Sequence, residues 1–144
     1  MNLKKVPNMA NEPILIVDDN PINLKLLKVL MTVEGYEVRT ATDAEEALNV
    51  LNSFTPALIL MDIQLPGIDG LELTRKLKAD PNYHDTIILA VTAYAMKGDD
   101  TKAIAAGCDG YITKPIDTQT LPKLIADYLT KKRLNDDDTD HTYH

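Results

Sequence analysis

Five polar residues lie at the ends of short apolar runs of the chain: Asp18 and the adjacent Asp19, Asp62, Thr92 and Lys114. Taken singly, an Asp or Thr after a strand is more often a turn or helix-cap residue. Together they form an all-oxygen set of carboxylates beside an ammonium and a hydroxyl. Such a set, without Cys or His, is typical of a site for a hard divalent cation such as Mg²⁺. With a carboxylate as nucleophile, these are also the groups that phosphoryl transfer requires.

The apolar runs themselves predict the strands of a sheet. Three of them are continuously apolar, which is typical of parallel strands buried on both faces, and a fourth is shorter. They span residues 14–17, 57–61, 87–91 and 110–113. Residues 36–40 alternate between apolar and polar side chains instead, so we expect a more exposed edge strand there.

Between the runs, apolar residues recur at helical spacing. The first such set lies before Gly35, which is a typical helix stop, and consists of Ile22, Leu26, Val29, Leu30 and Val33. Further helices are expected over 44–51, around 71–77 and over 97–106. A last helix, with its cap near Thr118 to Thr120, carries an apolar face that includes Leu121, Ile125 and Leu129. Five strands alternating with five helices predict an α/β fold. We expect a doubly wound, five-stranded parallel sheet in the order 2-1-3-4-5, in the flavodoxin-like (βα)5 arrangement.

This fold brings the polar residues together, because the carboxyl ends of parallel strands meet at one edge of the sheet. Asp62 follows the most central run and is the expected phosphoryl acceptor. Asp18 and Asp19 are adjacent and must point in different directions, so we expect them to hold the metal. Three clustered negative charges repel one another and require a cation.

Length and composition limit the remaining possibilities. The chain has 144 residues, 44% of them hydrophobic and 26% charged, as expected for one packed domain. Its net charge of -7 disfavours direct nucleic-acid binding. Cys108 is the single cysteine, which excludes an internal disulfide and fits a reducing cytoplasm. No apolar run has the length of a membrane span, so a cytoplasmic location is expected.

The domain boundaries follow from composition. We expect a flexible leader over residues 1–12 and a compact domain over 13–133. The segment 134–144 contains four acidic residues and no Lys or Arg, and is expected to be a disordered acidic tail.

Four strings of the sequence, ILIVDDN, LILMDIQLPGIDGLEL, AVTAYAMKGD and AAGCDGYITKPI, resemble in order and spacing the receiver domain of bacterial response regulators. The resemblance runs from about residue 13 to residue 131. The stretches MDIQLPGIDG and AVTAYAMKGDD are most similar to those of stand-alone receivers of the DivK type, which implies a role in cell-cycle signalling.

The resemblance implies a role for each acidic residue. Asp62 would accept a phosphoryl group from a histidine kinase or a histidine phosphotransfer protein. Asp19, Asp62 and the backbone carbonyl of Gln64 would bind Mg²⁺ or Mn²⁺, and Asp18 would act mainly through water. The chain would be a signalling protein and no enzyme beyond self-phosphorylation from small donors and autodephosphorylation.

The resemblance also implies how the signal leaves the site. Lys114 would pair with the phosphoryl oxygens, and its peptide bond to Pro115 would be cis. Thr92 and Tyr111 would be the switch pair, with the Thr92 hydroxyl turning toward the phosphoryl group and Tyr111 filling the vacated space. A downstream target protein would bind the face formed by the fourth helix, the fifth strand and the fifth helix.

Two alternatives remain. The chain could be a receiver from a hybrid histidine kinase, with the same chemistry and a different output. A phosphatase of the haloacid dehalogenase type also uses an aspartate nucleophile and Mg²⁺. It would, however, place a second Asp two residues after the nucleophile, where this chain has Gln64, and it would need a cap domain for which the length leaves no room.

Overall fold

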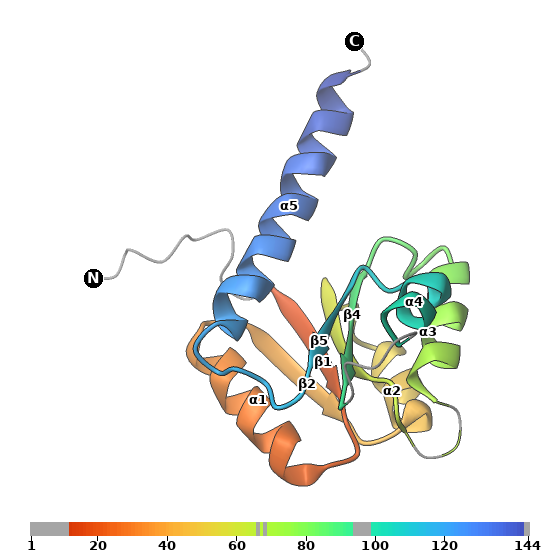
Figure 1. Cartoon of the computed structure of the whole chain (residues 1–144). Coiled ribbons are helices and arrows are strands. Elements are labelled where there is room, and N and C mark those ends of the chain that lie inside the picture. Colours follow the sequence, from red (N-terminus) through yellow and green to blue (C-terminus); the bar gives the residue numbers. More distant parts are fainter. Residues whose placement is uncertain (1–11, 66, 68, 94–98, 143–144) are drawn as a thin grey trace.

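A computed structural model describes residues 12–65, 67, 69–93 and 99–142; for 99–100, 133 and 135–142 it describes the backbone alone. The expected leader therefore lies outside the described residues except for Glu12. Strands and helices alternate along the chain (Figure 1). Their bounds are β1 (Pro13–Val17), α1 (Pro21–Val33), β2 (Glu37–Ala41), α2 (Ala44–Leu51), β3 (Leu58–Asp62), α3 (Gly70–Ala79), β4 (Ile87–Thr92), α4 (Asp99–Ala106), β5 (Gly110–Thr113) and α5 (Leu121–Thr142).

The five strands form one parallel sheet in the order β2-β1-β3-β4-β5, which confirms the predicted fold and strand order. All residues of β3 and β4 are buried, as expected for continuously apolar central strands. The alternating strand β2 lies at one edge and exposes two of its five residues. β3 therefore ends at Asp62 in the middle of the sheet.

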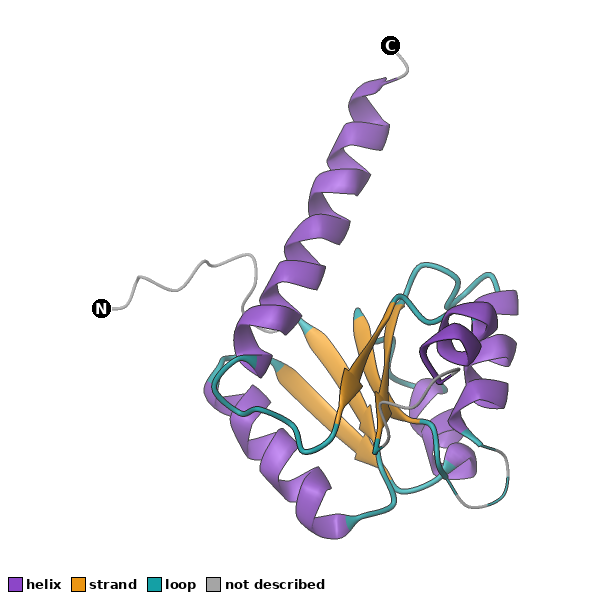
Figure 2. Cartoon of the chain, viewed as in Figure 1, coloured by secondary structure: helices purple, strands orange, loops and turns teal. Residues whose placement is uncertain are grey.

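Helices cover both faces of the sheet (Figure 2). α1 and α5 lie on one face, where Leu27, Met31 and Ile125 pack against alternate residues of the strands. α2, α3 and α4 lie on the other face, where Leu51 and Leu73 belong to a second apolar cluster. The sheet is thus enclosed between two apolar cores, and loops follow the strands at its carboxyl edge.

The inward face of α1 differs from the one that the helical spacing suggests. The helix forms where it was expected, but the buried residues are Leu24, Leu27 and Met31. Of the apolar set used to predict the helix, only Leu30 packs against the core; the other four, Ile22, Leu26, Val29 and Val33, are exposed. When a helix is apolar on two sides, the spacing of its apolar residues predicts that a helix forms but not which side it buries.

α5 begins as expected and runs beyond residue 133, the predicted end of the compact domain. The Thr120 carbonyl accepts the Leu124 N–H, so the first helical hydrogen bond starts inside the predicted cap region. The helix then continues to Thr142, through the segment that was expected to be disordered. No Gly or Pro follows Pro122, and acids stand four residues after Lys132 and Arg133, at a spacing that supports a helix.

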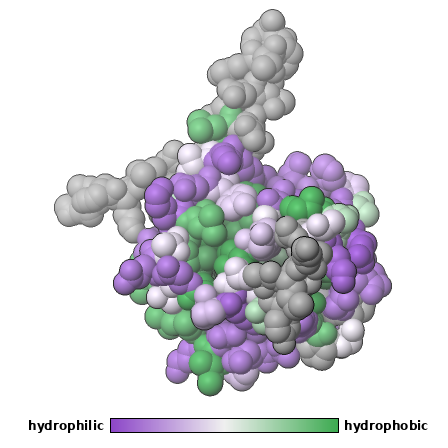
Figure 3. All heavy atoms as spheres, viewed as in Figure 1, coloured by the Kyte–Doolittle hydropathy of each residue, from purple (hydrophilic) through white to green (hydrophobic). Residues whose placement is uncertain are grey.

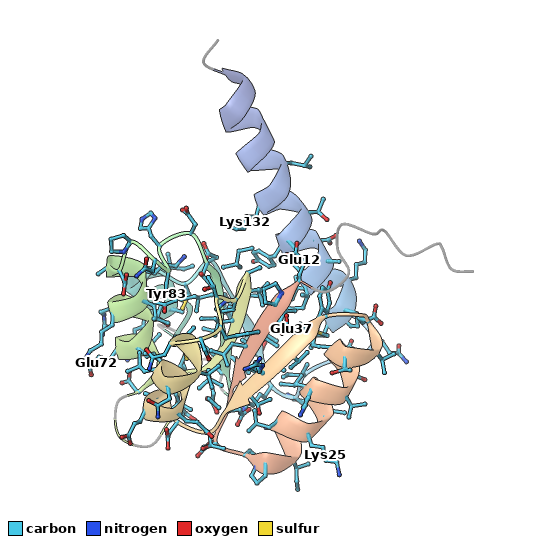
Figure 4. All side chains as sticks on the ribbon, turned by 180° about the vertical axis from the view of Figure 1, so that it is seen from behind. Glu12, Lys25, Glu37, Glu72, Tyr83 and Lys132 are labelled. Carbon is cyan, nitrogen blue, oxygen red and sulfur yellow. The ribbon has the colours of Figure 1, made fainter. Side chains whose placement is uncertain are left out.

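α5 is also fixed to the far edge of the sheet. Lys132 reaches from α5 toward the loop before β4 (Figure 4), where its Nζ donates to the Asp85 carbonyl at 2.8 Å.

Cys108 is a free, buried cysteine, and burial raises the pKa of its thiol. Within the described residues, no helix has the length and apolar character to cross a membrane.

Candidate functional site

The carboxyl edge of the sheet carries all five polar residues singled out above. Asp18 follows β1 directly, Asp62 and Thr92 are the last residues of β3 and β4, and Lys114 follows β5. β1, β3, β4 and β5 are consecutive neighbours in the sheet. Parallel pairing therefore places their final side chains side by side, and the expected convergence is present.

The three acids form one cluster. Asp18, Asp19 and Asp62 each offer a carboxylate oxygen, and these oxygens all lie within 4.8 Å of one another. Asp18 and Asp62 are buried, whereas Asp19 is exposed. Three hard anionic oxygens open to water on one side fit Mg²⁺, which binds through a few carboxylates and keeps several waters. The donor set contains neither Cys nor His and so does not favour a softer metal.

Lys114 supplies the positive charge at the cluster. Its Nζ lies 3.4 Å from Asp62 Oδ2 and 3.6 Å from Asp18 Oδ2, so one ammonium faces both buried acids. The Lys114 N–H donates to the Thr92 carbonyl at 2.7 Å, which joins the ends of β4 and β5. The peptide bond from Lys114 to Pro115 is cis, as expected. Two buried carboxylates therefore share a single cation.

The electrostatics of Asp62 follow from this arrangement. Burial raises the pKa of its carboxyl, and the neighbouring charge of Asp18 acts in the same direction. Lys114 and a hydrogen bond from the Gln64 N–H to Asp62 Oδ1, at 2.9 Å, lower the pKa but do not outweigh burial. The favourable contacts of the ionised Asp62 carboxylate therefore do not fully offset the cost of burying its charge. An added cation near this carboxylate, or a covalent bond to its oxygen, would reduce that cost.

Asp18 is held in place by the start of α1. Its Oδ1 accepts the Asn20 N–H at 2.8 Å, and its Oδ2 accepts from Asn23 Nδ2 at 3.5 Å. Asn20 is also the N-cap of α1, because its side chain accepts the Ile22 and Asn23 N–H groups. Sequence reasoning missed Asn23. The signal for it was an amide side chain three residues into a helix whose cap stands next to the acidic pair.

Gly70 allows α3 to begin directly against the end of β3. A Cβ at this position would collide with the Asp62 carbonyl oxygen and would lie 2.8 Å from Ile63 Cα. Gly70 is therefore required by close backbone contact, and its N–H donates to the Ile63 carbonyl at 3.2 Å. Sequence reasoning missed this residue too, because the contact joins segments that only the fold brings together.

The two expected switch residues differ in exposure. Thr92 is buried, whereas Tyr111 is 46% exposed. Tyr111 pairs with Ala90, two residues before Thr92, so the two side chains point to the same face of the sheet. The Gln64 side chain is exposed and its N–H is bound to Asp62. The role of its carbonyl as a metal ligand stays a prediction.

Comparisons with known proteins agree with this geometry. The sequence profile of the response regulator receiver domain matches residues 14–126. The polar-differentiation response regulator DivK of Brucella anthropi is 43% identical over 116 residues, which cover 81% of this chain and 94% of DivK. DivK of Brucella melitensis has the same identity and coverage.

Solved structures agree as well. A CheY-like receiver domain protein from Methanospirillum hungatei has a TM-score of 0.81 at 32% identity, covering 88% of this chain and 99% of its own. The receiver domain of the sensor histidine kinase PA1611 from Pseudomonas aeruginosa has a TM-score of 0.77 at 31% identity, covering 84% and 99%. That structure has a magnesium ion coordinated in its active-site cleft.

Proposed function

Because this chain belongs to the response regulator receiver family and is DivK-like over most of its length, we propose that Asp62 is its phosphoryl acceptor and that a histidine kinase or histidine phosphotransfer protein is the donor. The observation that carries the proposal is the position of Asp62, buried at the end of the central strand, 3.4 Å from Lys114 and within 4.8 Å of two further acids. The chain is a two-component signalling protein and not a classical enzyme. Neither its family nor Gln64, two residues after Asp62, supports the phosphatase alternative.

Each residue of the site has its own role in the proposed phosphoryl transfer. An oxygen of Asp62 attacks phosphorus, so that an O–P bond to Asp62 forms while the P–N bond of phosphohistidine breaks. The Lys114 ammonium pairs with the phosphoryl oxygens, and the Thr92 hydroxyl donates to one of them. The Gln64 N–H holds the Asp62 carboxylate in a fixed orientation. A small phosphate donor would replace phosphohistidine in this reaction, which gives the proposed self-phosphorylation. In the proposed autodephosphorylation, water would attack the phosphorus of the aspartyl phosphate, break its O–P bond and release inorganic phosphate.

Mg²⁺ is the proposed cofactor. Asp19, Asp62 and the Gln64 carbonyl would ligate it, with Asp18 orienting the site; Mn²⁺ has a similar preference for oxygen ligands. The bound ion supplies positive charge to the transferring phosphoryl group. We place the reaction in the cytoplasm, where a free buried thiol such as Cys108 stays reduced.

Replacing Asp19 by asparagine is expected to weaken Mg²⁺ binding about tenfold or more, because affinity follows the number of anionic ligands. Asp19 is the exposed acid of the cluster, so the fold should tolerate the change. Titration calorimetry measures the dissociation constant. The matched control is Asp85→Asn, which removes an exposed acid outside the cluster. Equal loss of affinity in both variants would show that overall charge, and not the cluster, binds the ion.

Thr92, Tyr111 and the α4–β5–α5 face form the proposed output. Movement of the Thr92 hydroxyl toward the phosphoryl group would open space for the exposed ring of Tyr111. Ile104 on α4 is 55% exposed and, with Tyr111, gives this face apolar groups that a target protein can bind. The phosphoryl group shifts the equilibrium only as far as it binds one conformation better than the other.

The proposed function is tested by mapping the phosphoryl group. We expect incubation with acetyl phosphate and Mg²⁺ to add the mass of one phosphoryl group, and EDTA to prevent the gain. Borohydride reduces an aspartyl phosphate to homoserine, so peptide mass spectrometry can locate the modified residue at position 62. A label on another residue, or a gain that does not depend on Mg²⁺, would refute the assignment.

A further inference from the structure

A pocket opens between the last turns of α2 and α3, at the end of the domain opposite the acidic site. Its volume is about 250 Å³, near the lower limit for small-molecule sites in proteins, and both helices and the loop after α3 line it. The crossover helices run back against the strands, so their last turns lie toward the amino ends of the strands, whereas Asp62 stands at a carboxyl end. The pocket is therefore separate from the proposed phosphoryl acceptor.

The deep part of the pocket is apolar. Leu51 and Leu77 line it and are only 4% and 2% exposed, because both also belong to the apolar cluster between the sheet and these helices. Leu48 lines it too but is 39% exposed. Tyr83 closes one side: Figure 4 shows it beside α3, and its hydroxyl donates to the Leu51 carbonyl at 3.0 Å. An aliphatic group in the pocket would therefore cover leucine surface that faces water.

Two opposite charges, Lys76 and Asp80, stand at the mouth of the pocket. They are four residues apart, but Asp80 is the C-cap residue of α3 and has an extended backbone. No ion pair within the described residues engages either side chain, whereas the neighbouring Lys78 is held with its Nζ 3.0 Å from Asp109 Oδ2. The outer surface over α3 is hydrophilic, at the right of Figure 3. Lys76 and Asp80 are therefore available to a ligand that arrives from solvent.

The α2 side of the mouth adds two amides, those of Asn49 and Asn52. An amide both donates and accepts hydrogen bonds, so it can bind a carboxylate or an ammonium. A simple anion at the mouth would meet the negative charge of Asp80, and a simple cation would meet the positive charge of Lys76. A molecule with both charges and a short aliphatic chain matches the whole set. An α-amino acid has this combination, whereas the terminal residue of a protein carries only one of the two charges.

We propose that the pocket binds a free α-amino acid with an aliphatic side chain, such as leucine. Its carboxylate would pair with Lys76, its ammonium with Asp80, and its side chain would pack on Leu48 and the buried leucines behind it. The inference goes beyond the proposed phosphotransfer and does not depend on it. The domain would then have a second input, because the amino acid would bind at one end of the sheet while the phosphoryl group is accepted at the other.

Four small molecules test the proposal. Leucine has both charges, N-acetyl-leucine lacks the ammonium, leucinamide lacks the carboxylate, and glycine lacks the aliphatic chain. Each is titrated into the full ¹⁵N-labelled chain at constant pH and ionic strength, and NMR gives the dissociation constant and the residues contacted. We expect leucine to bind about two- to fivefold more tightly than either modified form, since one exposed ion pair is lost in each. Glycine should bind at least about tenfold more weakly than leucine.

The shifts caused by leucine should centre on residues 48–52 and 76–83. No saturable shift in these residues, or equal binding of leucine and glycine, would overturn the proposal. If N-acetyl-leucine or leucinamide binds as tightly as leucine does, the pocket recognises a single charge, as at the end of a protein chain, and the proposal of a free amino acid is wrong.

Two charge variants and a matched control complete the test. Lys76→Gln should remove the advantage of leucine over leucinamide, and Asp80→Asn should remove its advantage over N-acetyl-leucine, because the group that recognises the missing charge is then gone. Arg75→Gln removes an exposed cation next to Lys76 but outside the pocket, and should keep both preferences. The assignment fails if Arg75→Gln behaves as Lys76→Gln does, or if both preferences persist in the two pocket variants.

Discussion

Asp62→Asn is expected to abolish covalent phosphorylation while leaving the chain folded. An amide oxygen is a poor nucleophile, and no other acid of the cluster stands at the end of the central strand beside Lys114 and the Gln64 N–H. Intact-mass spectrometry after incubation with acetyl phosphate and Mg²⁺ should show one added phosphoryl group in the wild-type chain and none in the variant. Asp85→Asn is the control and should label as the wild type does.

The same variant should be more stable at neutral pH in buffer without divalent metal. Folding raises the pKa of Asp62, so its contribution to stability is present below the ordinary pKa of Asp and is lost as the pH rises through the raised value. Removing the charge should therefore increase the free energy of unfolding by about 1–2 kcal/mol at neutral pH. The gain should disappear in acid, and urea unfolding at several pH values measures it. A gain that does not vary with pH would contradict this origin.

Lys114→Met is expected to slow phosphorylation by acetyl phosphate roughly 100-fold, as the loss of one preorganised charge donor commonly does. The variant should also lose about 2–4 kcal/mol of unfolding free energy at neutral pH, because two buried carboxylates then face each other without their shared cation. Lys114 also lowers the pKa of Asp62, so that pKa rises further in the variant. The stability deficit should therefore shrink as the pH falls.

Two comparisons isolate the role of Lys114. Lys123→Met removes an ammonium from an exposed pair with Asp127 and should change stability by less than about 0.5 kcal/mol. Adding Asp62→Asn to Lys114→Met should restore more stability than Asp62→Asn adds to the wild-type chain, because only one buried carboxylate then remains beside the vacated position. If the stability change of the double variant equals the sum of the two single changes, the loss in Lys114→Met comes from packing of the Lys114 side chain.

The fold was predictable because its strands are simple to identify. Strands buried on both faces appear as continuous apolar runs, and β2, at the edge, alternates. The side that α1 buries was not predictable, because the helix has two apolar sides, one with Leu24 and Leu27 and one with Ile22 and Leu26. Packing against the sheet determines which side is buried. α5 runs to Thr142, beyond the predicted domain boundary at residue 133, and no Gly or Pro follows Pro122 to end it.

The site was predictable to the same degree as the sheet. Once the strands are parallel, the residues that follow them must share an edge, so the sequence itself predicts that Asp18, Asp62 and Lys114 lie close together. The sequence could not show that Lys114 faces both acids at nearly equal distance. Nor could it show that α3 starts in contact with the Asp62 backbone, which depends on how the helix layer is seated.

The strands of the sheet differ in burial, and the difference separates the proposed acceptor from the proposed output surface. All residues of β3 are buried, whereas at the edge of the sheet β5 buries only Gly110 and exposes Tyr111. Local opening requires less free energy where fewer side chains are buried, so amide hydrogens of β5 should exchange with solvent well before those of β3. The proposed acceptor, Asp62, thus belongs to a strand that we expect to open slowly. The proposed output surface lies where less free energy is needed to rearrange it.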